Sequence, residues 1–559
     1  MVKRIFDLFN KEITNVHNAA FVLGFFTLFA QFVALFRDRL LASSFGAGSE
    51  LDLYYAAFKI PDIIFVTIAS LVSVSVLVPF IIEKSTANSN AEEKKFINNI
   101  FSFFLFLMLF VVIIVFIFMP YLSPKLFPGF NANEIETLIT LSRIMLLSPI
   151  LLGVSNIFGA ITQVHNRFVL YALAPLFYNI GIVIGIIVFV PKMGVMGLAF
   201  GVVLGAVMHL LIQLPGVILS NSFPRISFKF NWGSIRKVLE LSIPRTFTLA
   251  ANQLILIIFF AFASLMTAGS IAVFNFSLNL QSVPLSIIGV SYSLAAFPTL
   301  ARFYQEKHIE KFLTHIITAL RHIIFWSLPV IVYFVVLRAQ IIRVVLGGGE
   351  FSWQDTRLTA ASLALFSVSV VSQGLILLFV RAFYASGKTK IPFILSLVSV
   401  AISVLSAGIL YELYMKVPEF SLALSSILRI KEIPGGEITT LAIAYSIGNL
   451  CHLILLWFVF EKKIGRIWIF VKRTLWHSAI GALIGGLVTY AMLFIVVEHL
   501  VTDTLIGIFS QGLIAGIVGI AVNITILHIL GNEEQREIIA TLKRKIWKTE
   551  PIVTDGEVV

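Results

Sequence analysis

The chain has 559 residues, of which 58% are hydrophobic and only 13% are charged, and its mean hydropathy is +0.98. A soluble domain carries about 25% charged residues, so this composition excludes a soluble globular protein and indicates a membrane protein. The formal net charge is +12, and the single cysteine, Cys451, excludes a framework of disulfides within the chain.

Apolar runs long enough to cross a bilayer as helices, about 20 residues each, follow one another through the chain. None of them alternates over about ten residues as the strands of a membrane barrel do. The sequence therefore predicts an all-α polytopic membrane protein with about 14 transmembrane helices. In chain order the predicted spans are 17–41, 53–82, 96–119, 137–163, 168–190, 194–220, 238–265, 269–300, 312–337, 358–385, 391–412, 438–460, 474–498 and 504–530.

Lysine and arginine gather in every second gap between these spans. The amino-terminal tail and the alternate loops after it hold 27 of the 41 basic residues, whereas the remaining loops hold 8. Positive loops stay in the cytoplasm, so both termini are predicted to be cytoplasmic. This bias also accounts for the net charge, and nucleic-acid binding is not implied.

Landmarks recur at a nearly constant offset. Pro79 in the second span corresponds to Pro298 in the eighth, 219 residues later, and His165-Asn166-Arg167 corresponds to Gly387-Lys388-Thr389 at an offset of 222. We predict two pseudo-symmetric six-helix lobes, 1–222 and 236–461, followed by an additional pair of spans in 472–531 and a basic cytoplasmic tail, 532–559. Two lobes around a central cavity are the design of an alternating-access transporter.

No catalytic or cofactor motif accompanies the spans. The sequence lacks the G-x-x-x-x-G-K-[ST] loop of nucleotide hydrolases, a His/Cys metal cluster and the elbow of serine hydrolases. It also lacks a pore-lining filter motif of the kind that channels carry. We therefore expect a transporter that is not an enzyme, without cofactor or metal.

Charged residues inside the spans are the candidates for function. A charge at the bilayer centre costs about 2.5–3.5 kcal/mol on insertion scales, so such side chains usually face water or a partner. Arg37, Asp38 and Arg39 close the first span, Lys59 lies in the second and Arg245 in the seventh. Cations from both lobes could converge on one anion, and an arginine fork suits a phosphate. For Arg39 the alternative is a side chain that reaches out to lipid headgroups.

These residues resemble the opening signature of the MurJ/MviN family, the lipid II flippases of the multidrug/oligosaccharidyl-lipid/polysaccharide exporter superfamily. The matching stretch is Phe36-Arg37-Asp38-Arg39, Phe45-Gly46-Ala47-Gly48, Asp52 and Ala57-Phe58-Lys59-Ile60-Pro61. Further similarities include Ala174-Pro175-Leu176 with Asn179, Gly349-Glu350-Phe351, and Arg381-Ala382-Phe383-Tyr384-Ala385. Together they extend over about 15–460.

The resemblance implies a flippase that moves an undecaprenyl-diphosphate-linked glycan, foremost lipid II, across the bacterial inner membrane. Its implied partners are this lipid-linked substrate and membrane lipids, with no nucleic acid, and we expect a monomer. The predicted substrate-binding residues are Arg37, Asp38, Lys59, Arg245, Asn279 and Asp52. Of these, Arg37, Asp38, Asp52 and Lys59 match the family pattern, whereas Arg245 is inferred as a substitute for a missing cation.

The chain also departs from the family. Arginines of the family's flippases are replaced by Gln31, Phe65, Val66 and Asn279, and the seventh and eleventh spans lack the carboxylates of the family's sodium site. Three alternatives therefore stay open: a flippase for another polyprenyl-linked oligosaccharide, a cation-coupled small-molecule exporter of the same superfamily, and a membrane scaffold that does not transport.

The predicted outer loop 413–437 mixes apolar and polar residues. The apolar residues are mixed there with serines, Arg429 and Lys431, which predicts an amphipathic helix at the membrane interface; they are Phe420, Leu422, Leu424, Ile427, Leu428 and Ile430. A disordered loop is the alternative.

Overall fold

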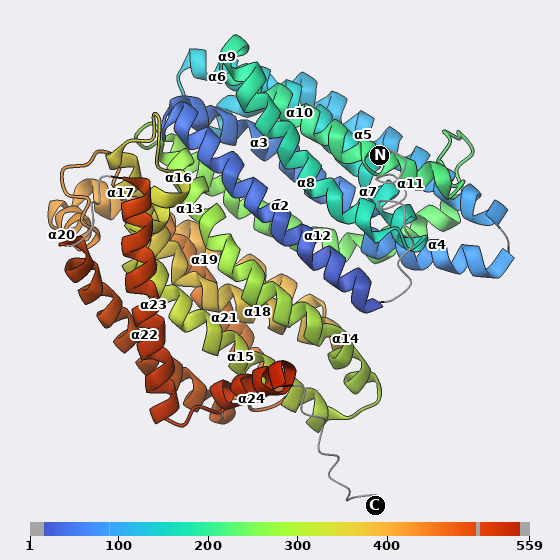
Figure 1. Cartoon of the computed structure of the whole chain (residues 1–559). Coiled ribbons are helices and arrows are strands. Elements are labelled where there is room, and N and C mark those ends of the chain that lie inside the picture. The colour runs from blue at the N-terminus through green and yellow to red at the C-terminus, as the bar shows by residue number, and fades with distance from the viewer. Residues whose placement is uncertain (1–15, 89, 499–503, 548–559) are drawn as a thin grey trace, which may run out of the picture. The chain divides into compact units, whose positions relative to one another are not determined.

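The computed structural model describes residues 16–88, 90–498 and 504–547, and side chains in a few helical stretches, Arg245 among them, lie outside that description. In the described residues all the longer regular elements are helices (Figure 1). An isolated β-bridge between Gly348 and Phe351 also occurs there. The helices are α2 (Val16–Phe45), α3 (Ser49–Ile68), α4 (Val74–Asn88), α5 (Asn90–Leu126), α6 (Ala132–Met145), α7 (Leu147–Val164), α8 (Phe168–Ile184), α9 (Val190–Met193), α10 (Val195–Leu211), α11 (Leu214–Leu219), α12 (Trp232–Ser264), α13 (Ser270–Leu285), α14 (Ser291–Gln305), α15 (Ile309–Val336), α16 (Arg338–Leu346), α17 (Trp353–Ser367), α18 (Ser369–Ala385), α19 (Lys390–Lys416), α20 (Pro418–Leu428), α21 (Ile438–Lys463), α22 (Trp468–Val497), α23 (Leu505–Ile529) and α24 (Glu533–Trp547).

The polytopic helical class is confirmed. Across the described residues, 11 helical segments are long and apolar enough to cross a membrane, or 12 if α17 and α18, which are bent by 41°, form one span. The predicted number of 14 is not confirmed by this count. Within the predicted seventh span, the described residues Gln253–Ser264 of α12 form an apolar helical segment.

Contacts within the chain define two compact units. The first comprises Met1–Leu280, Val345–Ser362 and Phe393–Gly448, and the second comprises Gln281–Val344, Leu363–Pro392 and Asn449–Val559. These units are groups of internal contacts and not sequence repeats. The lobes 1–222 and 236–461 therefore stay a prediction.

The first unit is held together by apolar packing and by closely approaching helices. A buried cluster joins α3, α4, α5, α7 and α12, with Phe104, Leu77 and Ile161 at its centre. Beside it, α8 and α10 almost touch, since a Cβ on Gly181 would lie 2.3 Å from the Cα of Gly205. Small residues are what allow membrane helices to approach so closely.

One end of the first unit is closed by a turn and a glycine-rich loop. The backbone N–H of Glu350 donates to the carbonyl of Ser43 near the end of α2, at 2.9 Å. Gly349 has φ +53°, and a Cβ there would lie 2.2 Å from the Ser43 oxygen, so only glycine fits. This contact fixes the turn between α2 and α3, which carries Gly46-Ala47-Gly48 of the family-like signature.

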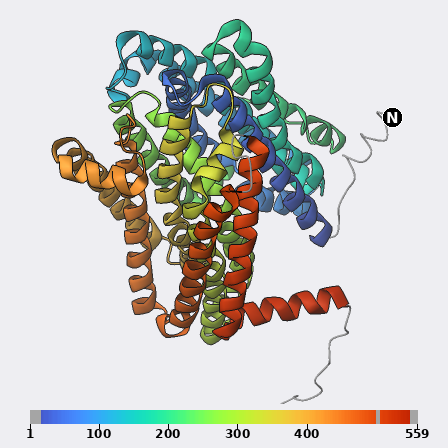
Figure 2. The same cartoon turned by 60° about the vertical axis from the view of Figure 1, so that its left-hand side comes forward.

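The helix predicted within 413–437 is confirmed as α20 (Pro418–Leu428), which ends where Arg429 adopts the left-handed conformation. Its position at a membrane interface stays a prediction. In the second unit, α22 packs against both α15 and α23, and α24 projects sideways from the end of α23 (Figure 2).

Candidate substrate site

Arg37 lies on α2, which packs against α8. Its Nε and Nη2 donate to Asp38 Oδ1 at 3.0 and 2.7 Å, and its Nη1 donates to Asn179 Oδ1 at 2.8 Å. Asn179 is held in turn by the carbonyl of Pro175, to which its Nδ2 donates at 3.0 Å. A guanidinium has five N–H donors, so two of them remain after these three bonds to described residues.

Asp38 is the centre of this cluster. Its side chain is 4% exposed, and its second oxygen, Oδ2, accepts a hydrogen bond from Asn279 Nδ2 at 3.0 Å. The carboxylate is therefore shared between a cation on α2 and a neutral amide on α13. Because Arg37 and Asp38 cancel each other's charge, this pair by itself gives the site no net positive charge.

Lys59 is the second cation of the site. It is buried on α3, 7% exposed, and its ammonium lies 4.0 Å from the centre of the Phe260 ring on α12. A cation over an aromatic face is stabilised by about 2 kcal/mol or more when it is desolvated. Asp62, three residues further along α3, interacts with this ammonium electrostatically but forms no ion pair with it among the described residues, so its three N–H donors remain available to an anion.

Asp52 has a different environment. Its Oδ2 accepts from the backbone N–H of Gly269 at 2.6 Å and its Oδ1 accepts from that of Ala272 at 2.8 Å. These N–H groups open α13 and have no partners inside the helix, so the buried carboxylate caps that helix and interacts favourably with its dipole. Asp52 thereby joins the beginning of α3 to the beginning of α13.

Because Asp52 joins the beginnings of α3 and α13, positions along these two helices can be compared. Lys59 follows Asp52 by seven residues on α3, and Asn279 follows Ala272 by seven residues on α13, which is about 10 Å along each helix. The Arg37–Asp38–Asn279 cluster and Lys59 therefore occupy the same level of the first unit. The structure joins three of the six predicted site residues, Arg37, Asp38 and Asn279, by hydrogen bonds. The residue spacing places Lys59 at a similar level and Asp52 about two turns away.

The two remaining arginines differ. Arg245 belongs to α12, but its side chain lies outside the described residues. Arg39 donates from Nη1 to the carbonyl of Val345 at 3.5 Å, and this contact joins α2 to the end of α16.

Asn179 and Phe260 were not among the predicted site residues. Asn179 had a visible signal, because it is a polar side chain in an otherwise apolar helix and is 9% exposed. Phe260 had none, since an aromatic residue in an apolar run is typical of any span. Neither partner lies near its cation in sequence.

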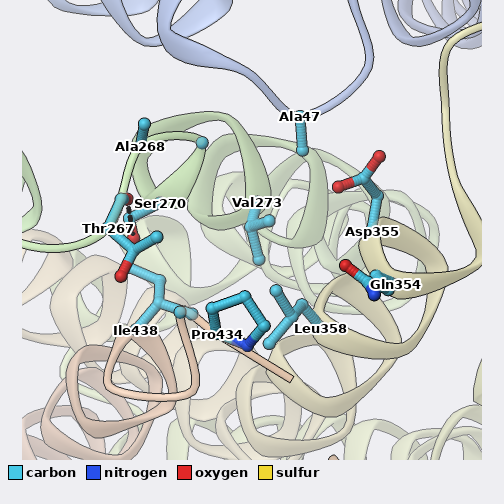
Figure 3. Close-up of a pocket in the computed structure, with 12 residues that line it drawn as sticks. Ala47, Thr267, Ala268, Ser270, Val273, Gln354, Asp355, Leu358, Pro434 and Ile438 are labelled. Atoms are coloured by element: carbon cyan, nitrogen blue, oxygen red, sulfur yellow. Dashed lines mark hydrogen bonds between the residues drawn. The ribbon is translucent and has the colours of Figure 1, made fainter. Parts of the chain in front are cut away.

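A small pocket lies beyond the α13 cap, at the ends of the helices. Thr267 and Ser270 are on one side of it and Gln354 and Asp355 on the other, with Ala47 pointing in from the turn between α2 and α3 (Figure 3). Its volume of about 140 Å³ is below the range of about 300–1,000 Å³ that is typical of ligand pockets. The pocket is too small for a glycan headgroup and is separate from the basic residues.

Known proteins are similar in sequence to this chain over most of its length. Residues 41–510 match the family model described as lipid II flippase MurJ. A probable lipid II flippase MurJ of Buchnera aphidicola is 29% identical over 371 residues, which cover 66% of this chain and 72% of that protein. A lipid II flippase MurJ of Burkholderia cenocepacia is 23% identical over 399 residues, covering 70% and 76%.

Solved structures show the same fold. A lipid II flippase MurJ in an inward closed conformation matches with a TM-score of 0.71 at 22% identity, over 93% of this chain and 100% of that one. An inward-facing multidrug resistance transporter of the MATE family matches with a TM-score of 0.63 at 17% identity, over 78% and 94%. Because the family model matches most of the chain, the protein belongs to the lipid II flippase MurJ family.

Proposed function

We propose that this chain moves an undecaprenyl-diphosphate-linked glycan, foremost lipid II, from the cytoplasmic to the outer leaflet of the bacterial inner membrane by alternating access. Both termini are cytoplasmic in this proposal, and the protein acts as a monomer. No covalent chemistry is needed, since only the headgroup crosses the membrane. The observation that supports it most directly is a pair of cations, the partly exposed Arg37 and the buried Lys59, in largely apolar helices.

The diphosphate is the part of the substrate that these cations fit. Arg37 retains two N–H donors and Lys59 three, and a charge-assisted hydrogen bond to a phosphate oxygen is roughly twice as strong as a neutral one. Neutral sugars and a prenyl tail offer no comparable reason to keep cations inside a membrane protein. The headgroup is therefore held at this level while the tail stays in lipid.

The Arg37–Asp38 pair gives this binding a second feature. In the structure, two of the three bonds that Arg37 makes go to Asp38. A diphosphate that takes the fork of Arg37 competes with this carboxylate, and Asp38 then keeps its hydrogen bond from Asn279. Release of the substrate restores the pair, so binding is reversible and need not be tight.

Asp52 and Asn179 have positioning roles in this proposal. Asp52 fixes the depth of α3 relative to α13, and Asn179 fixes the direction of the Arg37 fork. The charge of Lys59 also gives the membrane potential something to act on, at about 2.3 kcal/mol per charge per 100 mV.

A flippase for another polyprenyl-linked glycan is the second candidate. It is favoured by Phe65, which packs against the apolar cluster of the first unit, where family flippases carry an arginine. Complementation of a bacterium depleted of its essential lipid II flippase separates the two. Growth restored by this chain supports lipid II as the substrate, and failure at normal membrane abundance favours the other glycan.

A further inference from the structure

The last helix, α24, begins at the end of a membrane span and turns away from it. Only three residues separate Ile529, the end of α23, from Glu533, the start of α24. The side chain of Asn532 caps the new helix by accepting from the backbone N–H of Gln535 at 2.8 Å. In both views α24 runs sideways from the end of α23 instead of extending it (Figure 2).

Ion pairs fix the first turn of α24 to the spans beside it. Glu534 is 2% exposed and accepts from Arg321 on α15 and from Thr474 on α22, at 2.5 and 2.6 Å. Glu533 pairs with the same Arg321 at 2.5 Å and with Arg473 at 3.1 Å. The start of α24 is therefore attached to α15 and α22, and its direction follows from this attachment.

Beyond the first turn the sequence of α24 is amphipathic and basic. With 100° of rotation per residue, Ile538, Ile539, Leu542 and Ile546 occupy one stripe of the helix, and Lys543 and Lys545 fall on its two borders. Residues 535–547 include four basic residues and one acidic residue, Glu537. Ile539 is 37% exposed, so the stripe is not covered by the described residues at that point.

We propose that α24 docks onto the membrane surface by binding anionic lipid headgroups. An apolar stripe that is bordered by lysines suits the boundary between headgroups and acyl chains, because lysine stems reach outward to phosphates while the stripe enters the bilayer. The opposite charge of the lipid is what selects it over a neutral surface. Through the ion pairs of Glu533 and Glu534, the docked helix holds α15 and α22 at a defined depth.

Hydrogen–deuterium exchange on the full-length protein tests this docking. The protein is placed in nanodiscs of phosphatidylcholine alone and in nanodiscs that also contain phosphatidylglycerol. We expect amides of 538–547 to exchange more slowly in the anionic discs, and this protection to disappear at about 1 M salt, where the Debye length is about 3 Å. The variant K543Q/K545Q should reduce the lipid-dependent protection by roughly thirty-fold, because two surface charges are lost.

The matched control is K311Q/K390Q, which removes two exposed lysines from other helices of the second unit. It should leave the protection unchanged. Equal exchange in both kinds of disc would overturn the proposal and indicate that α24 is held by protein contacts alone. Loss of protection in the control as well as in K543Q/K545Q would overturn it too, since general net charge would then be the cause. Neither outcome depends on whether the chain transports lipid II.

Discussion

Removing Arg37 should produce two separable defects, one in folding and one in transport. In R37A, Asp38 stays buried with its side chain 4% exposed and loses two of the three hydrogen bonds described for it, keeping the one from Asn279. Breaking one partner out of a buried ion pair typically costs about 3–5 kcal/mol. We therefore expect R37A to lower the free energy of unfolding by about this amount.

The double variant R37A/D38N removes the stranded charge. An asparagine at position 38 can still bond Asn279, so stability should return to within about 0.5–1.5 kcal/mol of the parent protein, the scale of a neutral hydrogen bond. Thermal unfolding in nanodiscs measures both variants. If Arg37 binds the diphosphate, however, neither variant should transport.

The transport assay is complementation of the depleted bacterium at matched amounts of folded protein. We expect no growth with R37A or R37A/D38N and partial growth with R37K, because an ammonium keeps the charge but loses the fork. R39A is the control and should be far milder, since Arg39 bonds the carbonyl of Val345. Growth supported by R37A/D38N would refute a role for Arg37 in substrate binding, and equal stability of R37A and the double variant would refute the buried pair.

Three other perturbations each address a single feature of the molecule. D52N should destabilise the protein by about 1.5–3 kcal/mol, because the charged cap of α13 becomes neutral. The control E50Q, at an exposed position in the same turn of α3, should have little effect on stability. Unfolding in detergent measures both variants, and equal effects would contradict the role of Asp52 as a cap. Burial alone raises the pKa of Glu534, but hydrogen bonds from Thr474 and Arg321 outweigh it and lower the pKa overall. Its stabilisation is therefore present at neutral pH and is lost as the pH falls through the lowered value, so unfolding below the ordinary range of glutamate should depend less on pH in E534Q, and equal pH dependence in both proteins would speak against this assignment. A cysteine at position 91, in a C451A background, should react only with membrane-permeant reagents if the positively charged loops are cytoplasmic. Labelling by an impermeant reagent in intact cells would show that the predicted orientation is wrong.

The sequence by itself determined the class of the protein and the residues that needed explanation. Hydropathy depends only on local composition, so the apolar runs predicted the helical membrane fold. Charges inside such runs are costly and therefore conspicuous, which is why Arg37, Asp38 and Lys59 stand out in the amino-acid sequence. Helix count was less certain, because breaks such as the one between α17 and α18 depend on how neighbouring helices pack.

The tertiary structure alone decided what these charges contact. Arg37 meets Asn179 across 142 residues, Asp38 meets Asn279 across 241, and Asp52 meets Gly269 across 217. No periodicity in the sequence records a contact between helices so far apart, since a hydrogen bond depends on where two helices lie beside each other and on how each is rotated. For this reason Asp52, predicted to bind substrate, was found as a helix cap, and Arg321, which lies near the end of a span, was found holding α24 through Glu533 and Glu534.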